Sequence, residues 1–594
     1  MKALLLLALA AAALVGTGRA AAAVPSLGPN VVVLNPSMPQ SAIQGTLDSI
    51  ATQQVHNEFG TQRYTVFFEP GTYGSAANPL AFQLGYYTQV AGLGTTPNDV
   101  VINGAVDVFN QCSGGPCEGL TNFWRSLSNL TLNVDLPTAP PNPPTGEDPG
   151  CDNSNDLFAV SQAAPVRSVI VNGTLFLQDY CNQGFVSGGF FANDELNGFV
   201  CNCGQQQYFA RNSAVPQWSN GVWNQVFLGD TGAPATAFGP GTNQYTNVPA
   251  TPVSEEPPYL TDGGIVVPAV RHASSGPSYA VGTTIPYNRV FVADPSTSVL
   301  VIDLELALGR NLILTPGVYH LAAPITVLYP NQIVLGLGLA TLVPTRGNAV
   351  LETASVPGIK ISGLTVDAGP VNSQVLMQIG GRNAGGTHDA NDPTVLSDAF
   401  FRIGGATPGR ATTSLVVNAD NAILDDVWAW RADHGNGVGW TSNTADTGVV
   451  VNGDNVSAYG LFVEHYQKFE VVWNGENGTD VFFQNEMPYD VPSQAAWSSS
   501  PTTKGYAAFL VAPGVRSFHG YGMGSYSFFD QGVDIYASQA FQAPTAPGVQ
   551  FGDVLTVFLD ATNGRGGILS VIDGVGGSST AANPDVPVDV NAYP

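Results

Sequence analysis

The chain contains two copies of one pattern, and this internal duplication limits the folds open to it. The segment VFFEPGTY (66–73) leads into PLAFQLGYYTQVAGLG (79–94), and LILTPGVY (312–319) leads into PITVLYPNQIVLGLG (324–338). Further matches are Asn35-Pro36-Ser37 with Asp294-Pro295-Ser296, and 128–135 with 362–369. The simplest interpretation is two tandem copies of one domain.

Within each copy, short apolar runs alternate with Gly, Asn, Asp and Pro turns, a pattern typical of all-β proteins. Only segments near 40–52 and 296–308 have helical spacing. A shorter repeat places NGDNVS before Glu464 and NGENGT before Glu486, with an offset of 22 residues in both cases. Repeats of this length suit successive coils of a parallel β-helix. We therefore predict two tandem right-handed parallel β-helices, with one large β-sandwich as the alternative.

The first residues have the pattern of a secretory signal peptide. Lys2 precedes an apolar run that ends in small residues near Ala23, and no later stretch is apolar enough to span a membrane. We expect a secreted, extracellular protein without a membrane span. The predicted divisions are a signal peptide at 1–23, an N-terminal β-helix at 24–232, a Pro-rich connection at 233–290 and a C-terminal β-helix at 291–594.

Charge excludes some partners. The chain carries 45 acidic and 19 basic residues, a net charge of −26, which argues against DNA or RNA and, less strongly, against polyanionic sugars. The seven His residues show no metal-ligand spacing, and no metal or cofactor is predicted. GLGLAT (336–341) resembles a nucleotide-binding loop but lacks the helix and acidic partner, so we interpret it as a β-helix turn.

The cysteines predict disulfides in an oxidising compartment, although their pairing stays open. The alternative for Cys201 and Cys203 is a metal site, for which C-x-C alone is a weak signal. The six residues are Cys112, Cys117, Cys151, Cys181, Cys201 and Cys203. Glycan acceptor motifs stand at Asn129, Asn172, Asn455 and Asn477.

Glu464 and Glu486 are the first candidate catalytic residues. Stacked coils place equivalent positions about 4.8 Å apart, the spacing of neighbouring strands. Two close carboxylates raise each other's proton affinity, and glycosidic cleavage needs a protonated carboxyl group as general acid. The alternative is a pair of solvated turn residues on an acidic surface.

The segments LFVEHYQKFEVVW (461–473) and FFQNEMPYDVP (482–492) resemble the catalytic region of glycoside hydrolase family 55. The resemblance implies a pectate-lyase-like fold of two β-helices and inverting hydrolysis of a β-1,3-glucan such as laminarin. It places the general acid at Glu486 and a second site carboxylate at Glu464. Tyr489 lies within the same segment and is a candidate for substrate binding.

Inversion needs a water between the sugar and the base, with carboxyl groups about 6.5–9.5 Å apart. Two stacked coils can be too close for this, so Glu464 can orient or tune Glu486 while other groups hold the water. Gln205, Gln206 and Gln207 of the first copy are candidates for holding it. The alternative is an amide ladder or loop without a catalytic role.

DDVWAWRADHGNGVGW (425–440) is the other dense group of functional side chains. Asp433 and His434 are candidates for contacts to sugar hydroxyls, and Asp433 also for the base. Trp430 and Trp440 are candidate sugar platforms. The alternatives are an Arg431–Asp433 salt bridge and tryptophans packed inside a coil, and Asp425-Asp426 is expected to be a solvated turn.

The favoured function is a secreted, monomeric hydrolase of a neutral glucan. A polysaccharide lyase is the second hypothesis, and it would need a cationic group such as Arg402, Arg410 or Arg431 to neutralise a uronate. A non-catalytic glucan-binding or cell-surface protein is the third, because a fold does not fix a function.

Overall fold

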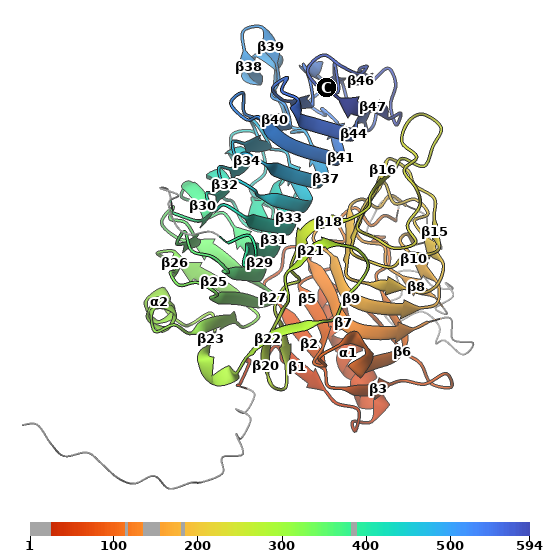
Figure 1. Ribbon diagram of the computed structural model, residues 1–594, viewed down its shortest axis with the longest axis vertical. Coiled ribbons are helices and arrows are strands. Elements are labelled where there is room, and N and C mark those ends of the chain that lie inside the picture. The colour runs from red at the N-terminus through yellow and green to blue at the C-terminus, as the bar shows by residue number, and fades with distance from the viewer. Residues whose placement is uncertain (1–24, 113–116, 135–154, 180–183, 382–388) are drawn as a thin grey trace, which may run out of the picture.

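The structure is a computed structural model that describes residues 25–112, 117–134, 155–179, 184–381 and 389–594. Two stacks of strands stand side by side, the first from β1 (Val31–Leu34) to β17 (Tyr245–Val248) and the second from β23 (Val290–Ala293) to β47 (Val588–Tyr593) (Figure 1). Neighbouring strands in the long sheets pair in parallel, apart from β47, which ends the second stack antiparallel to β44. The predicted tandem β-helices are confirmed.

The first strand stack is the first β-helix, and the second stack is the second β-helix; they are called the first and second helix below. The first helix has a thirteen-stranded sheet and a four-stranded sheet. Besides β1 and β17, the larger sheet contains β2 (Tyr64–Phe68), β3 (Gly71–Tyr73), β4 (Leu80–Gln83), β5 (Thr88–Gly92), β6 (Val100–Asp107), β7 (Arg125–Asn133), β9 (Pro165–Asn172), β11 (Gly189–Ala192), β12 (Glu195–Leu196), β14 (Gln207–Arg211) and β16 (Asn224–Leu228). The smaller sheet contains β8 (Asp156–Leu157), β10 (Leu175–Phe176), β13 (Val200–Cys201) and β15 (Trp218–Ser219). The short 3₁₀ helix η1 (Pro97–Asp99) precedes β6.

The second helix has a twelve-stranded sheet and an eight-stranded sheet. Besides β23 and β47, the larger contains β24 (Asn311–Leu314), β25 (Val318–Leu321), β27 (Ile333–Pro344), β29 (Lys360–Asp367), β31 (Thr394–Ile403), β33 (Ala422–Arg431), β35 (Ser457–Glu464), β37 (Gly478–Glu486), β41 (Ser517–Ser527) and β44 (Gly548–Phe558). The smaller contains β26 (Ile325–Val327), β28 (Leu351–Thr353), β30 (Ser373–Ile379), β32 (Ala411–Val417), β34 (Ala445–Val451), β36 (Val471–Trp473), β40 (Phe509–Val511) and β43 (Phe541–Gln542). Short elements complete it: η2 (Tyr287–Arg289), η3 (Gln494–Ala496), β38 (Ser498–Ser500), β39 (Thr503–Lys504), β42 (Ile535–Ala537), β45 (Gly566–Ile568) and β46 (Ser579–Thr580).

The two copies repeat each other down to single hydrogen bonds. The Tyr73 hydroxyl donates to the carbonyls of Leu34 (2.9 Å) and Glu69 (2.8 Å). The Tyr319 hydroxyl donates to the matching carbonyls of Ala293 and Thr315, both at 2.9 Å. One α-helix packs on each copy near its start, α1 (Gln40–Gln54) on the first and α2 (Val299–Ala307) on the second. Both lie where the sequence shows helical spacing.

The 22-residue coil is visible in the strand register. Ser457 of β35 lies opposite Thr479 of β37. The turns that precede these two strands stack through their amides, since the Asn474 side chain donates to that of Asn452 at 2.8 Å. Polar ladders at the turns and apolar side chains inside each coil thus stabilise the stack together.

Each helix presents its larger sheet to the other, and a column of left-handed residues marks this contact. In the second helix the column occupies successive strands, at Gly363, Asp398, Asp426, Gly460, Phe482, Gly522 and Asp553. In the first helix it comprises Asn129, Ser168, Asn193, Asn212 and Gly229. Glycine, Asn and Asp predominate because they tolerate a positive φ.

The connecting segment lies between the two stacks (Figure 1). Its strands form two small antiparallel sheets, from β18 (Thr251–Ser254) and β21 (Arg271–Ser274), and from β19 (Tyr259–Thr261), β20 (Gly264–Pro268) and β22 (Val281–Ile285). The first helix extends through β17, past the expected boundary at 232.

Two sequence expectations about local structure are wrong. Residues 336–341 lie within the long strand β27 rather than in a turn between strands, and the strand register shifts at the left-handed bend formed by Gly338 and Leu339. Asp425 and Asp426 are buried on β33 rather than in a solvated turn. Asp425 instead pairs with Arg167 (2.7 Å) and Arg211 (2.9 Å) of the first helix.

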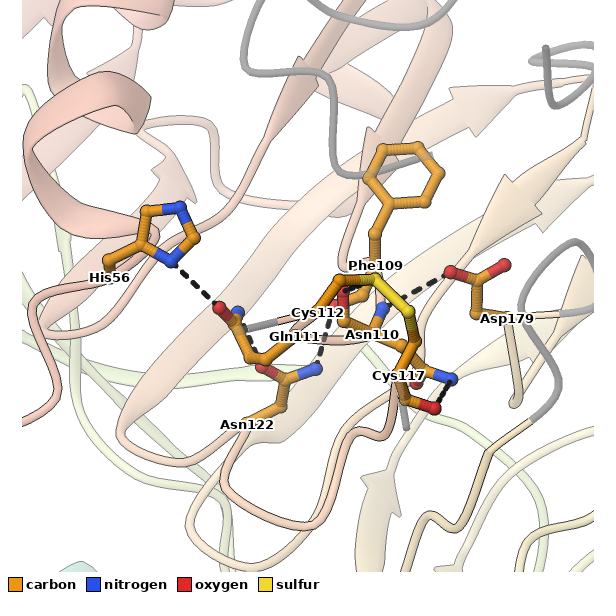
Figure 2. Close-up of a disulfide and its surroundings, with 8 residues drawn as sticks. All are labelled: His56, Phe109, Asn110, Gln111, Cys112, Cys117, Asn122 and Asp179. Carbon is orange, nitrogen blue, oxygen red and sulfur yellow. Dashed lines mark hydrogen bonds between the residues drawn. A yellow bond between two sulfur atoms is a disulfide. The ribbon is translucent and has the colours of Figure 1, made fainter. Parts of the chain in front are cut away.

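Two of the expected disulfides are present, Cys112–Cys117 and Cys201–Cys203. Figure 2 shows the first beside Gln111, which accepts a hydrogen bond from His56 Nδ1 at 3.0 Å and donates to Asn122 at 3.0 Å. These contacts tie the loop that follows α1 to the first helix. Cys151, Cys181 and the expected signal peptide lie outside the described residues.

Of the glycan acceptor motifs, Asn129 is buried and its amide donates to the carbonyls of Gly92 (2.9 Å) and Gly94 (2.8 Å). A glycan there would require this packing to open. Asn172, Asn455 and Asn477 are exposed. Among the described residues, none of the helices is both long and apolar enough to cross a membrane.

Candidate active site

Glu464 and Glu486 end neighbouring strands of the second helix. Glu464 is the last residue of β35 and Glu486 the last of β37. The backbone N–H of His465 donates to the Glu486 carbonyl at 2.8 Å, so the ladder continues to the point where both side chains leave the sheet. The structure therefore brings together the two carboxylates that the repeat predicts.

The surroundings of Glu464 come from both helices. Gln162 of the first helix donates its amide to Oε1 at 2.8 Å, and the Trp428 indole donates to Oε2 at 2.8 Å. The residue is 3% exposed. Burial, and then the charge of Glu486, raise the pKa of Glu464 well above its ordinary value. Because both partners can only donate from these atoms, they favour the ionised carboxylate when a single proton is shared with Glu486.

Glu486 is the more accessible carboxyl group, with a side chain 20% exposed. Burial raises its pKa, while His465 and a hydrogen bond from the Tyr489 hydroxyl oppose part of this rise. His465 Nε2 lies 3.7 Å from Oε2. A carboxyl group with a raised pKa and an open side can deliver a proton to a bound ligand.

Asp433 and His434 form a charged pair beside these carboxylates. His434 Nδ1 lies 2.8 Å from Asp433 Oδ1, and Nε2 lies 2.8 Å from Glu58 Oε1. Burial opposes the charged imidazole, but hydrogen bonds to Asp433 and Glu58 raise the His434 pKa to about 10. Burial would also raise the pKa of Asp433, but the His434 hydrogen bond and the charge of His465 hold it below its usual range. Asp433 is therefore ionised.

The alternative interpretation of Asp433, a salt bridge with Arg431, does not hold. The guanidinium of Arg431 instead grips Asp490, with N–O distances of 2.9 and 2.7 Å. Asp433 Oδ1 faces His434 and, at 4.0 Å, His465.

The structure places the candidate tryptophans in packed surroundings. Trp430 is 2% exposed and lies parallel to Phe59 of the first helix, with ring centroids 6.3 Å apart. Trp440 is partly buried against the hydrophobic core of the second helix, and the Arg431 guanidinium lies 5.6 Å from the centre of its ring. Trp430 thus packs between the two β-helices rather than inside a coil, and Trp440 stays partly exposed.

The three candidate glutamines of the first helix differ in position. Gln205 is buried and donates to the Val160 carbonyl at 2.7 Å, whereas Gln206 is half-buried. Gln207 accepts from the Ser187 hydroxyl at 2.6 Å, and this hydroxyl accepts from Gln484 of the second helix at 3.4 Å. Only Gln207 thus joins a polar network that crosses between the helices.

Sequence reasoning missed several residues of this region. Gln162, Ser187 and Glu58 lie in the first copy, far along the chain from the motifs, and no repeat points to them. His465 and Gln484 lie within the motif segments, beside or two residues before a candidate glutamate, and this adjacency is a signal that could have been used. A separate cavity of about 90 Å³ near Arg167 is not lined by Glu464 or Glu486 and plays no part in this chemistry.

Nothing in the described parts of the chain groups three His, Cys, Asp or Glu side chains in a metal-holding arrangement. The arginines that a lyase would need are engaged elsewhere. Arg402 pairs with Asp367 at 2.6 Å, Arg431 grips Asp490, and Arg410 donates to the Ser442 carbonyl at 2.9 Å.

Comparison with known proteins places these residues in context. A family model described as the LAM55 pectate lyase-like domain matches residues 290–486, which include Asp433, Glu464 and Glu486. An exo-β-1,3-glucanase of Streptomyces sp. (strain SirexAA-E / ActE) is 44% identical over 576 residues, covering 96% of this chain and 90% of the relative.

Solved structures give the same result. The structure of sacteLam55A from Streptomyces sp. SirexAA-E has a TM-score of 0.88 and 44% identity, covering 96% of this chain and 100% of that one. A variant of sacteLam55A in complex with glucose has a TM-score of 0.88 and 43% identity, covering 96% and 99% of the two chains.

Proposed function

The chain belongs to the Lam55 exo-β-1,3-glucanases of glycoside hydrolase family 55, and we propose that it cleaves β-1,3-glucan such as laminarin from the chain end by inverting hydrolysis. It is a glycoside hydrolase, and its substrate is a glucan. The observation that carries the mechanism is the pairing of Glu464 and Glu486 at the ends of adjacent strands, with different partners for each.

Glu486 is the proposed general acid. Its carboxyl group has the open side and the raised pKa needed to protonate the glycosidic oxygen as the bond breaks. Glu486 is oriented by Tyr489 of its own helix, whereas Glu464 is oriented by Gln162 of the other.

Glu464 and Gln162 are proposed to hold the attacking water. The carboxylate of Glu464 takes up the proton that the water loses, and the Gln162 amide orients the carboxylate. We assign the shared proton to Glu486, because protonation there removes the neighbouring charge that raises the Glu464 pKa, and both oxygens of Glu464 then accept hydrogen bonds as an ionised carboxylate. Inverting hydrolysis requires this distribution, a protonated acid and an ionised base.

We further propose that the enzyme acts as a monomer outside the cell. The apolar leader at 1–23 and the disulfides support export. Both walls of the site come from one chain, since Gln162 and Glu464 belong to different helices of the same molecule.

The test is incubation of the purified protein with laminarin near pH 5, with Glu486→Gln beside the wild type. We expect glucose release by the wild type and a loss of at least about a hundredfold in kcat for the variant, the usual scale of general acid catalysis. Glu352→Gln, on β28, is the matched control and should retain activity. Proton NMR of the first product should show the inverted anomer. Equal rates for Glu486→Gln and the wild type would disprove the acid assignment.

A further inference from the structure

Arg431 connects the segments that carry the proposed acid and its neighbours. It is the last residue of β33, and its side chain is 1% exposed. Its Nε donates to the Asn443 carbonyl at 2.8 Å, and one terminal nitrogen donates to the His465 carbonyl at 3.1 Å. With its contact to Asp490 in the loop after β37, the planar guanidinium joins three loops that follow three different strands. The single ammonium group of a lysine could not do this.

The strongest contact of Arg431 is its ion pair with Asp490. Both terminal nitrogens of Arg431 reach one oxygen each, at 2.9 and 2.7 Å, in a two-pronged arrangement. Asp490 directly follows Tyr489 in the loop after β37. Holding Asp490 thus fixes the backbone from which the Tyr489 side chain extends.

Tyr489 connects the Arg431–Asp490 ion pair, called the clamp below, to the proposed acid Glu486. Its hydroxyl donates to Glu486 Oε2, and its ring meets the His465 ring edge-on, with centroids 4.4 Å apart. Its ring also packs on Phe528, and its carbonyl accepts from the Asp530 N–H at 3.1 Å. The clamp is one of several restraints on the loop, but it is the charged one.

We propose that Arg431 is a positioning residue that, by clamping Asp490 and the His465 carbonyl, holds the Tyr489 hydroxyl against the Glu486 carboxyl group. The proposal rests on the proposed function, in which Glu486 is the general acid. A donated hydrogen bond stabilises the ionised carboxylate, so a loosened Tyr489 leaves Glu486 with a higher pKa.

Several charged or titratable groups face Glu486 from the elements packed around it. Tyr489 comes from its own loop, His465 and Glu464 from β35 and its end, Asp433 and His434 from the loop after β33, and Tyr526 from β41. Asp490→Asn changes none of these side chains and removes one charge from the clamp. The variant therefore reports on how firmly the loop holds Tyr489.

The experiment measures kcat against pH on laminarin for the wild type, Asp490→Asn, Tyr489→Phe and the double variant. Activity falls at high pH when the acid loses its proton, so Tyr489→Phe should move this limb upward by about one pH unit. Asp490→Asn should move it in the same direction, by no more than Tyr489→Phe. In the Tyr489→Phe background, Asp490→Asn should cause no further shift of the alkaline limb. The KM of Asp490→Asn should stay within about twofold of the wild-type value.

Arg431→Lys should shift the limb at least as far as Asp490→Asn. Because five donors of Arg431 are buried, this variant can fail to fold, and Asp490→Asn then carries the test since its side chain is 22% exposed. The matched control is Asp367→Asn, which opens the buried Arg402–Asp367 pair (2.6 Å). It should lower the thermal midpoint and leave the alkaline limb unchanged.

An unmoved limb in Asp490→Asn, or a shift that adds fully to that of Tyr489→Phe, would overturn the proposal while the wild type stays active. An inactive wild type, or a Glu486→Gln variant with wild-type activity, would instead overturn the proposed function, and this proposal with it. The two failures are thus distinguishable.

Discussion

His434 is the residue whose charge depends most clearly on its neighbours. Both ring nitrogens lie 2.8 Å from a carboxylate oxygen, of Asp433 on one side and Glu58 on the other. Two such acceptors require both nitrogens to carry a proton, which agrees with a pKa of about 10. The imidazolium therefore joins the loop after α1 to the loop after β33 at neutral pH.

His434→Gln should remove a stabilising contribution that depends on pH. Since the folded pKa of about 10 exceeds the unfolded value of about 6.5, this contribution is complete below pH 6.5 and is lost as pH rises toward 10. We expect the variant to melt below the wild type at pH 6 and the difference to disappear near pH 10. Thermal unfolding across this range measures it.

His320→Gln, at an exposed position on β25, is the control for that measurement. A difference between His434→Gln and the wild type that stays constant from pH 6 to pH 10 would show that His434 contributes only packing.

The left-handed column is the feature of the strands that allows the two helices to approach. At Gly460 the backbone has a φ of +67°, and a Cβ there would lie 2.7 Å from Cδ2 of Phe190 on the first helix. At Gly522 a Cβ would lie 2.4 Å from Cγ2 of Val226. Glycine stands at both places because the opposite helix occupies the space as well as because φ is positive.

Gly460→Ala should destabilise the protein by more than about 2 kcal/mol, since it adds a clash to the cost of a left-handed alanine. Gly45→Ala is the matched control. It lies in α1 with nothing near its Cβ position, and it should stabilise by about 0.5–1 kcal/mol. Denaturant unfolding gives both values. Wild-type stability in Gly460→Ala would mean that the interface yields easily.

At the scale of the whole molecule, sequence predicts what repeats within one helix. The 22-residue offset places Glu464 and Glu486 on adjacent coils, and the duplicated segments predict two helices. It does not predict contacts between the helices, because those join residues as far apart as Gln162 and Glu464, 302 positions. Trp430 illustrates the limit, since periodicity does not reveal that its face of the coil is covered by Phe59.

The helices are joined by buried ion pairs as well as by aromatic packing. Arg167 of the first helix contacts Asp398 and Asp425 of the second, both at 2.7 Å. Its third partner is Glu256 of the connecting segment, at 3.3 Å. One guanidinium thus links three parts of the fold, and its removal would leave several carboxylates buried without it.

Arg167→Met should therefore destabilise the protein by about 3–5 kcal/mol at pH 8, the cost of leaving a buried charge without its partner. Burial already raises the pKa of Asp398, and the loss of Arg167 raises it further, whereas Asp425 keeps Arg211, so stability increases as pH falls through the Asp398 pKa. The deficit should shrink at pH 5. Urea unfolding at both pH values measures this.

The control is Lys468→Met, which removes an exposed pair with Asp446 (2.7 Å) and should cost at most about 1 kcal/mol. A deficit for Arg167→Met that is equally small, or equal at both pH values, would mean that packing alone holds the helices together.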